Sequence, residues 1–155
     1  MNGRTWVLVA DSTKARIYTT YKAKLFMPQA NENDLKLLNE YKHPESRKHD
    51  SQLVSDNSGR YRATEFGSDT YDPPTDPKRY EEDRFAFQLS KVLHEAYLEN
   101  EFEQLILIAS PVFMGMLNKH ISRANGLQKS VAITIEKDYT SLNERQLVKQ
   151  LQEHL

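Results

Sequence analysis

The sequence predicts an α/β protein in which helices cover both faces of a mixed β-sheet. Two continuous apolar runs, at residues 6–10 and 105–109, are typical of strands that are buried on both faces. Three further strand patterns and three helix patterns give the order strand, strand, strand, helix, strand, helix, strand, helix. A β-meander followed by two right-handed crossovers is the ribonuclease H-like arrangement, a three-layer fold around a five-stranded mixed sheet.

The remaining strands are predicted from weaker patterns. Residues 16–22 alternate between apolar and polar side chains, which suits a strand covered on one face. Residues 35–43 and 131–136 are further strand candidates, and a helix remains an alternative for residues 35–43. Residues 24–34 contain a proline and several Asn and Gln residues, so they predict a loop.

The first helix is predicted to begin at Asp76, with Pro77 in its first turn, and to run to about Glu99. Its apolar side chains recur at the spacing of a single helical face. These residues are Phe85, Leu89, Val92, Leu93, Ala96 and Tyr97.

Two more helices have signals at their ends. One opens at Ser110, directly after a buried strand, and is predicted to stop at residues 125–126, where a glycine can take the left-handed conformation. The other carries the capping-box spacing of Ser141 and Glu144, followed by an apolar stripe.

Length and composition predict a single domain over residues 1–155 with a cytoplasmic address. The chain is 38% hydrophobic and 28% charged, and it contains no apolar stretch long enough to span a membrane. Its N-terminus leads into a strand and not into an export signal. The absence of cysteine excludes disulfides and thiolate chemistry. Because the net charge is −1, binding to nucleic acid would need a local basic patch.

The connection at residues 44–75 is the most unusual segment. Connections of this length inside one domain are typical of binding loops, lids or disordered segments. Its first half is rich in basic residues around a tyrosine, a combination that pairs with phosphates and stacks on a base. The basic and aromatic residues of this half, together with the preceding lysine, are Lys42, Arg47, Lys48, His49, Arg60, Tyr61 and Arg62.

Asp11 closes the first strand and is followed by Ser12, Thr13 and Lys14, so it is a candidate catalytic carboxylate. A ribonuclease H-like nuclease holds two metals with carboxylates on the first strand, the first helix and the end of the fourth strand. The fourth strand here ends in Ser110, and Glu81–Asp83 on the first helix are explained equally well by the helix N-terminus. We therefore predict that Asp11 is a turn residue, with a metal-dependent hydrolase as an alternative.

No other chemical motif is complete. The sequence lacks both glycine-rich nucleotide fingerprints, so no cofactor is predicted. His43 and His49 lie close to Asp50, but histidines in a charged loop are more often solvated, and no metal site is predicted. His94 and His120 fall on helices and are expected to be partly buried with hydrogen-bond partners.

Several spaced segments resemble one known family, the bacterial host-attachment proteins. The segments are WVLVADSTKARIY, HPESRKHDSQLVSDNSGR, FAFQLSKVLHEA, LILIASPVFMGMLNKHI and EKDYT. That family in turn resembles the middle domain of eukaryotic and archaeal peptide-release factors and of Pelota, which implies the same fold. The sequence contains no Gly-Gly-Gln, so the resemblance does not imply ester hydrolysis. The family's recurrent polar positions fall on Asp11, Glu45, Arg47, Asp56, Gly59, Arg60 and Asp138.

The function expected from these patterns is non-enzymatic binding of the ribosome, ribosomal RNA or tRNA. A protein-interaction or regulatory factor in surface attachment is the first alternative, and the metal-dependent hydrolase is the second. The predicted binding residues are Asp11, Lys14, Arg47, Lys48, His49, Arg60, Tyr61 and Arg62.

Overall fold

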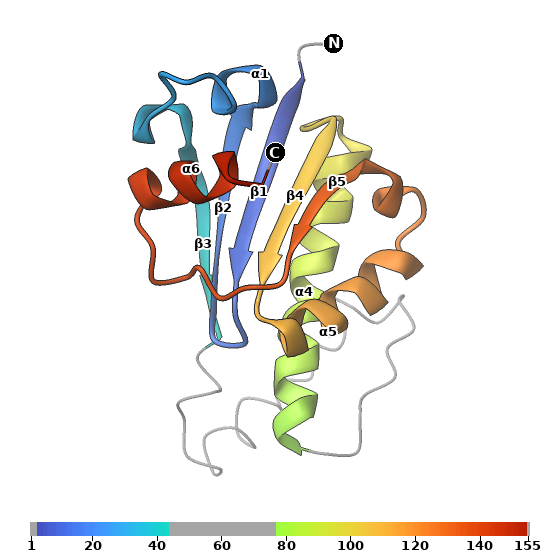
Figure 1. The fold of residues 1–155 in the computed structure, drawn as a ribbon. Helices are drawn as coiled ribbons and strands as arrows, with labels where there is room; N and C mark the ends of the chain where they lie inside the picture. Colours follow the sequence, from blue (N-terminus) through green and yellow to red (C-terminus); the bar gives the residue numbers. More distant parts are fainter. Residues whose placement is uncertain (1–2, 44–76, 155) are drawn as a thin grey trace.

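The computed structural model of the chain describes residues 3–43 and 77–154, which form a five-stranded mixed sheet with helices on both faces (Figure 1). The strand order is β3-β2-β1-β4-β5. Neighbours are antiparallel from β3 to β1 and parallel from β1 to β5. The strands are β1 (Arg4–Ala10), β2 (Lys14–Tyr21), β3 (Lys36–Lys42), β4 (Gln104–Ala109) and β5 (Val131–Ile135). The predicted ribonuclease H-like arrangement is confirmed, and residues 36–42 form a strand and not a helix.

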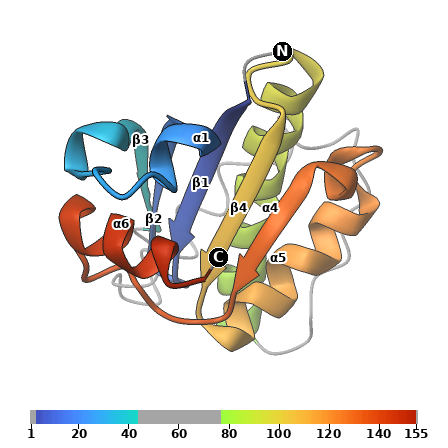
Figure 2. The same ribbon diagram turned by 45° about the horizontal axis from the view of Figure 1, so that its top comes forward.

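The helices make the outer two layers. On one face, α4 (Pro77–Leu98) and α5 (Pro111–Arg123) pack against the sheet and against each other. On the other face lie α6 (Glu144–Gln152) and the short α1 (Lys22–Leu25), as Figures 1 and 2 show. None of the described helices is long and apolar enough to cross a membrane.

The two central strands, β1 and β4, carry the core on both sides. Leu8 and Leu107 face α4 and α5, whereas Val7 and Ile108 face α6, and all four are fully buried. Burial of such a side chain contributes roughly 1.5–3 kcal/mol. The uninterrupted apolar runs of these strands therefore reflect helices on both faces, as predicted.

Local details differ from the sequence predictions at two helix ends. The helix α6 begins with a capping box between Asn143 and Gln146, and not between Ser141 and Glu144. The helix α5 ends at Arg123, earlier than predicted, and Gly126 instead opens the 3₁₀ helix η3 (Leu127–Ser130). Gly126 does adopt the left-handed conformation, with φ of 86°.

The segment predicted as a loop at residues 24–34 is only partly irregular. It contains the last residues of α1 and the 3₁₀ helix η1 (Glu32–Asp34), which Asn31 caps by accepting a hydrogen bond from the Asn33 amide. Short polar turns of this kind follow from Asn and Asp side chains that bond to nearby amides, a signal that periodicity does not detect.

Replacing Gly126 by alanine is expected to destabilise the fold. The left-handed backbone disfavours a side chain by about 1–2 kcal/mol, and an added Cβ would lie 2.9 Å from the Tyr97 hydroxyl oxygen. Gly115→Ala is the matched control, because Gly115 lies inside α5 with open space around it, and alanine there should be neutral or stabilising by roughly 0.5–1 kcal/mol. Urea denaturation of both variants checks the difference, and equal effects would contradict it.

Candidate anion-binding pocket

Two of the predicted binding residues, Asp11 and Lys14, are described by the structure. They lie at the turn between β1 and β2, at the carboxyl end of β1. The other six predicted binding residues lie outside the described residues. These are Arg47, Lys48, His49, Arg60, Tyr61 and Arg62.

The Asp11 carboxylate shapes the turn between β1 and β2. Its Oδ1 accepts hydrogen bonds from the Thr13 amide at 2.8 Å, the Thr13 hydroxyl at 2.8 Å and the Lys14 amide at 2.9 Å. The backbone adds a bond from the Asp11 amide to the Lys14 carbonyl oxygen at 2.9 Å. Asp11 therefore has the role of a turn residue, in agreement with the sequence prediction.

The second Asp11 oxygen has a long-range partner. The Thr140 hydroxyl lies 3.2 Å from Asp11 Oδ2 and 2.6 Å from Asp138 Oδ1, so its single hydrogen has two carboxylates within reach. Burial raises the pKa of Asp11, but the hydrogen bonds from Thr13, Lys14 and Thr140 together lower it by a larger amount, so the net shift is downward. Over residues 3–43 and 77–154, no three acidic or histidine side chains gather closely enough to hold a metal ion.

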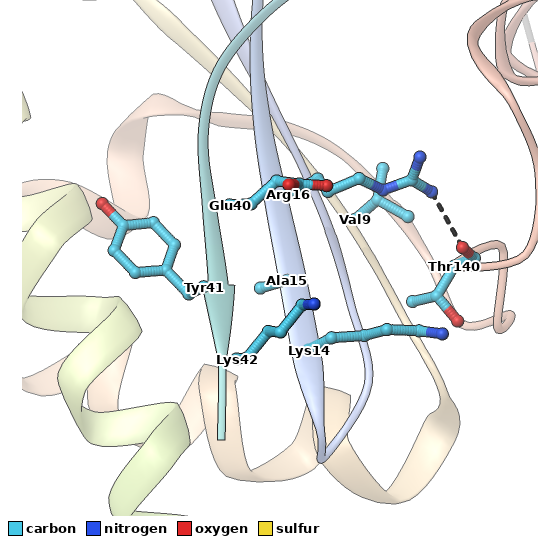
Figure 3. A pocket seen from close by; sticks show the side chains of 8 residues that line it. All are labelled: Val9, Lys14, Ala15, Arg16, Glu40, Tyr41, Lys42 and Thr140. Atoms are coloured by element: carbon cyan, nitrogen blue, oxygen red, sulfur yellow. Dashed lines mark hydrogen bonds between the residues drawn. The ribbon is translucent and has the colours of Figure 1, made fainter. Parts of the chain in front are cut away.

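A pocket of about 190 Å³ lies beside this turn, on the face of the sheet that carries α6. Figure 3 shows Lys14, Arg16 and Lys42 extending on the same side of the strands as Thr140, whereas the Tyr41 ring lies on the opposite side. The lining residues are Val9, Lys14, Ala15, Arg16, Glu40, Tyr41, Lys42 and Thr140.

The register of β2 and β3 determines the charges of the pocket. Arg16 is opposite Glu40, and Lys14 is opposite Lys42, so one pair is of opposite charge and the other is of like charge. Lys14 and Lys42 are both exposed, and neither forms an ion pair with any residue in the described part of the chain. Like charges directly opposite each other destabilise a strand pair, and an anion bound between them would relieve this repulsion.

The segment at residues 140–144, which includes the lining residue Thr140, forms one wall of the pocket and is held by two side chains of β2. The Arg16 guanidinium donates to the carbonyl oxygens of Thr140 and Leu142, each at 3.0 Å, and lies over the Tyr18 ring. The Tyr18 hydroxyl donates to Glu144 Oε2 at 2.9 Å at the start of α6. Burial, and then the bond to Glu144, raises the pKa of Tyr18 above its ordinary value, so the hydroxyl stays a donor.

His43 is buried, which corrects the expectation of a solvated loop histidine. Its ring stacks on Phe85 with centroids 5.1 Å apart, and Nδ1 lies 3.2 Å from the Ser12 carbonyl oxygen. Its backbone amide donates to the Thr13 carbonyl oxygen at 2.8 Å. The residue directly after β3 is therefore anchored to the Asp11 turn, which holds Lys42 next to Lys14.

A second polar cluster, between α4 and α5, was not predicted. From the sequence, Asp83 was explained by the favourable interaction of a carboxylate with the N-terminus of a helix, but this side chain is only 1% exposed. Its Oδ1 lies 2.9 Å from Lys119 Nζ and 3.2 Å from His120 Nε2. Residues three and four apart lie on the same face of a helix, so Asp83 shares a face with the buried Ala86 and Phe87. This spacing was the signal in the sequence from which the burial of Asp83 could have been predicted.

The two helical histidines have the partners expected of them. His120 is buried beside Asp83, and the partly buried His94 has Nε2 at 3.1 Å from the Asn125 carbonyl oxygen. Burial lowers the pKa of His120, and the nearby Asp83 only partly offsets this.

The fold and the pocket define a three-layer α/β protein with a cationic pocket at the carboxyl end of its first strand. The chain belongs to the family described as "Protein required for attachment to host cells", whose sequence pattern matches residues 6–151. The resemblance to host-attachment proteins is thereby confirmed. A comparison with curated proteins gave no match.

Replacement of Asp11 by asparagine is expected to destabilise the fold by about 0.5–1.5 kcal/mol, because a neutral amide oxygen accepts the bonds from Thr13 and Lys14 more weakly than a carboxylate does. Because the pKa of Asp11 is lowered from 3.8 on folding, the unfolded chain binds more protons below pH 3.8, and the stabilisation is lost as pH falls through this window. Denaturation of wild type and Asp11→Asn should give curves that converge below pH 3.8. Parallel curves would contradict this prediction.

The stability should also fall as the pH drops below 6.5 because of His120. Its pKa is lower in the folded protein than the ordinary 6.5, so the unfolded chain takes up the proton first. His120→Gln should reduce the change in the free energy of unfolding between neutral pH and pH 5, as measured by urea denaturation. His154→Gln, at an exposed position, is the matched control, and an equal flattening by both variants would refute the assignment.

Proposed function

We propose that the protein is a single-domain, non-enzymatic binding protein of the host-attachment family, and that its pocket contacts the phosphate groups of ribosomal RNA or tRNA. The observation that carries this proposal is the cross-strand pair Lys14 and Lys42, two exposed ammonium groups with no ion-pair partner in the described chain. Lysine is a common point-charge ligand of phosphate.

The sequence around the pocket supports a nucleic-acid ligand. The net charge of the chain is −1, so the whole molecule does not attract polyanions and a local patch has to supply the attraction. Lys42 is the last residue of β3 and directly precedes the segment that contains Arg47, Lys48, Arg60 and Arg62. The pocket lysines therefore extend a basic stretch of sequence that is itself suited to a phosphate backbone.

Binding is favoured over hydrolysis by the state of Asp11. Both of its oxygens already accept hydrogen bonds from the protein, three at Oδ1 and one at Oδ2. These bonds account for the carboxylate by a structural role at the turn, and in this proposal no reaction is assigned to Asp11. In this proposal the protein acts in the cytoplasm, and its effect on attachment is exerted through the bound RNA.

A second candidate function, docking of a protein partner, rests on the strand β3. This strand is at the edge of the sheet, and its two leucines, Leu37 and Leu38, are 43% and 38% exposed. Among the described residues, β3 pairs with a strand on one side only, and a strand edge with exposed apolar side chains is suited to the addition of a strand from another chain. Partners that remain bound after nuclease treatment in a pull-down, and that are lost in Leu37→Lys, would favour this alternative.

Exchange of the pocket lysines for glutamine is expected to weaken binding to tRNA. The double variant Lys14→Gln/Lys42→Gln should reduce the slope of log K against log salt by about one unit per lysine, because fewer counterions are released. Lys36→Gln is the matched control, since Lys36 is also exposed on β3 but does not line the pocket. Filter binding or fluorescence anisotropy at low and physiological salt measures the effect.

Two outcomes would refute the proposal. One is the absence of association with tRNA and with ribosomes at both salt concentrations. The other is a loss of binding free energy in Lys36→Gln equal to the loss per lysine in the pocket variant, which would show that only the overall charge matters.

A further inference from the structure

The charges of the pocket leave two positive charges without compensation. Glu40 is opposite Arg16 in the register of β2 and β3, and its one negative charge offsets part of the three positive charges that Lys14, Arg16 and Lys42 bring to the pocket. Lys14 and Lys42 are opposite each other, and within residues 3–43 and 77–154 neither forms an ion pair with a carboxylate. The best electrostatic match for this arrangement is a compact group with two negative charges.

The size of the pocket limits what can enter it. Its volume of about 190 Å³ is below the roughly 300–1,000 Å³ of typical small-molecule sites. The space is therefore suited to one small anionic group, and the remainder of a larger ligand would lie outside on the surface.

The wall opposite the lysines has little freedom to adjust. Arg16 is bonded to the carbonyl oxygen of Thr140, as Figure 3 shows, and to that of Leu142. The Thr140 hydroxyl lies within hydrogen-bond distance of Asp11 and Asp138. Such a wall holds a small group between itself and the two lysines without reorganisation on binding, which favours selectivity.

We infer that the pocket selects a phosphomonoester, the terminal phosphate of an RNA chain, over the internal phosphodiesters of the same chain. This inference rests on the proposed function and specifies which phosphate the pocket takes. A monoester carries about −1.5 to −2 charges at pH 7 and matches the two lysines. An internal diester carries a single negative charge and therefore matches the two lysines less well.

The test compares three forms of one short RNA: with a 5′-phosphate, with a 3′-phosphate, and with hydroxyls at both ends. At least one phosphorylated form should bind about 5-fold or more tightly than the hydroxyl form, the ratio expected for one additional charge pair at ~4 Å in water. Lys14→Gln/Lys42→Gln should abolish this ratio, and Lys36→Gln should preserve it. Glu40→Gln should bind the phosphorylated form more tightly than wild type does, because it removes a negative charge from the pocket.

A small-molecule arm tests the same selectivity without RNA. Methyl phosphate, a monoester, should shift the backbone amide resonances of Lys14 and Lys42 at lower concentration than dimethyl phosphate, a diester. A phosphoserine peptide is included because it presents the same chemical group. Tighter binding of the peptide than of the phosphorylated RNA would overturn the assignment to an RNA end.

The inference and the proposed function fail in different ways. RNA binding that depends on Lys14 and Lys42, with equal affinity for phosphorylated and hydroxyl ends, overturns the inference alone. Absence of binding to every RNA overturns the proposed function. Preservation of the end preference in the pocket variant overturns the location of the site.

Discussion

The contact between the Asp11 carboxylate and the Thr140 hydroxyl joins two distant parts of the chain on which the pocket depends. Oδ1 of the carboxylate organises the turn after β1, and Oδ2 holds the connection between β5 and α6 against that turn. The same connection supplies the carbonyl acceptors of Arg16 and the pocket residue Thr140, so the contact with Asp11 adds to the bonds that hold this wall of the pocket in place. One side chain therefore sets both the local backbone and the long-range geometry, and the site is a consequence of how the sheet is closed at this end.

Strand β2 shows how one segment serves the core and the pocket together. Its residues alternate between the two faces, so Ala15 and Ile17 pack beneath α4 whereas Arg16 and Tyr18 point toward α6. The Arg16 guanidinium and the Tyr18 hydroxyl have partners on the segment at residues 140–144, which satisfies groups that burial would otherwise penalise. Side-chain alternation in one strand thus separates a hydrophobic face from a polar, ordered one.

The sequence was most informative where one local pattern decides the structure. The apolar runs of β1 and β4 and the end signals of α4 predicted the sheet order and the layers, because burial on two faces leaves a clear pattern. The start of α6 was missed, since capping boxes at Ser141 and Asn143 are two residues apart and compete equally well in sequence. The pocket residue Thr140 and the buried Asp83 were also missed, because their partners are far away in the chain.

The like-charge pair Lys14 and Lys42 links binding to stability. The two ammonium groups repel each other in the free protein, while the anchored turn and His43 prevent the strand ends from separating to relieve that repulsion. In the proposed function, an anion between them would remove this repulsion and add its own attraction, so relief of the repulsion would contribute to the binding free energy. In the proposed function, a ligand that binds only the assembled strand ends would also stabilise the native state, by an amount that grows with the logarithm of its concentration. Ligand affinity and the stability of the β2–β3 pair are therefore two measures of the same electrostatic interaction.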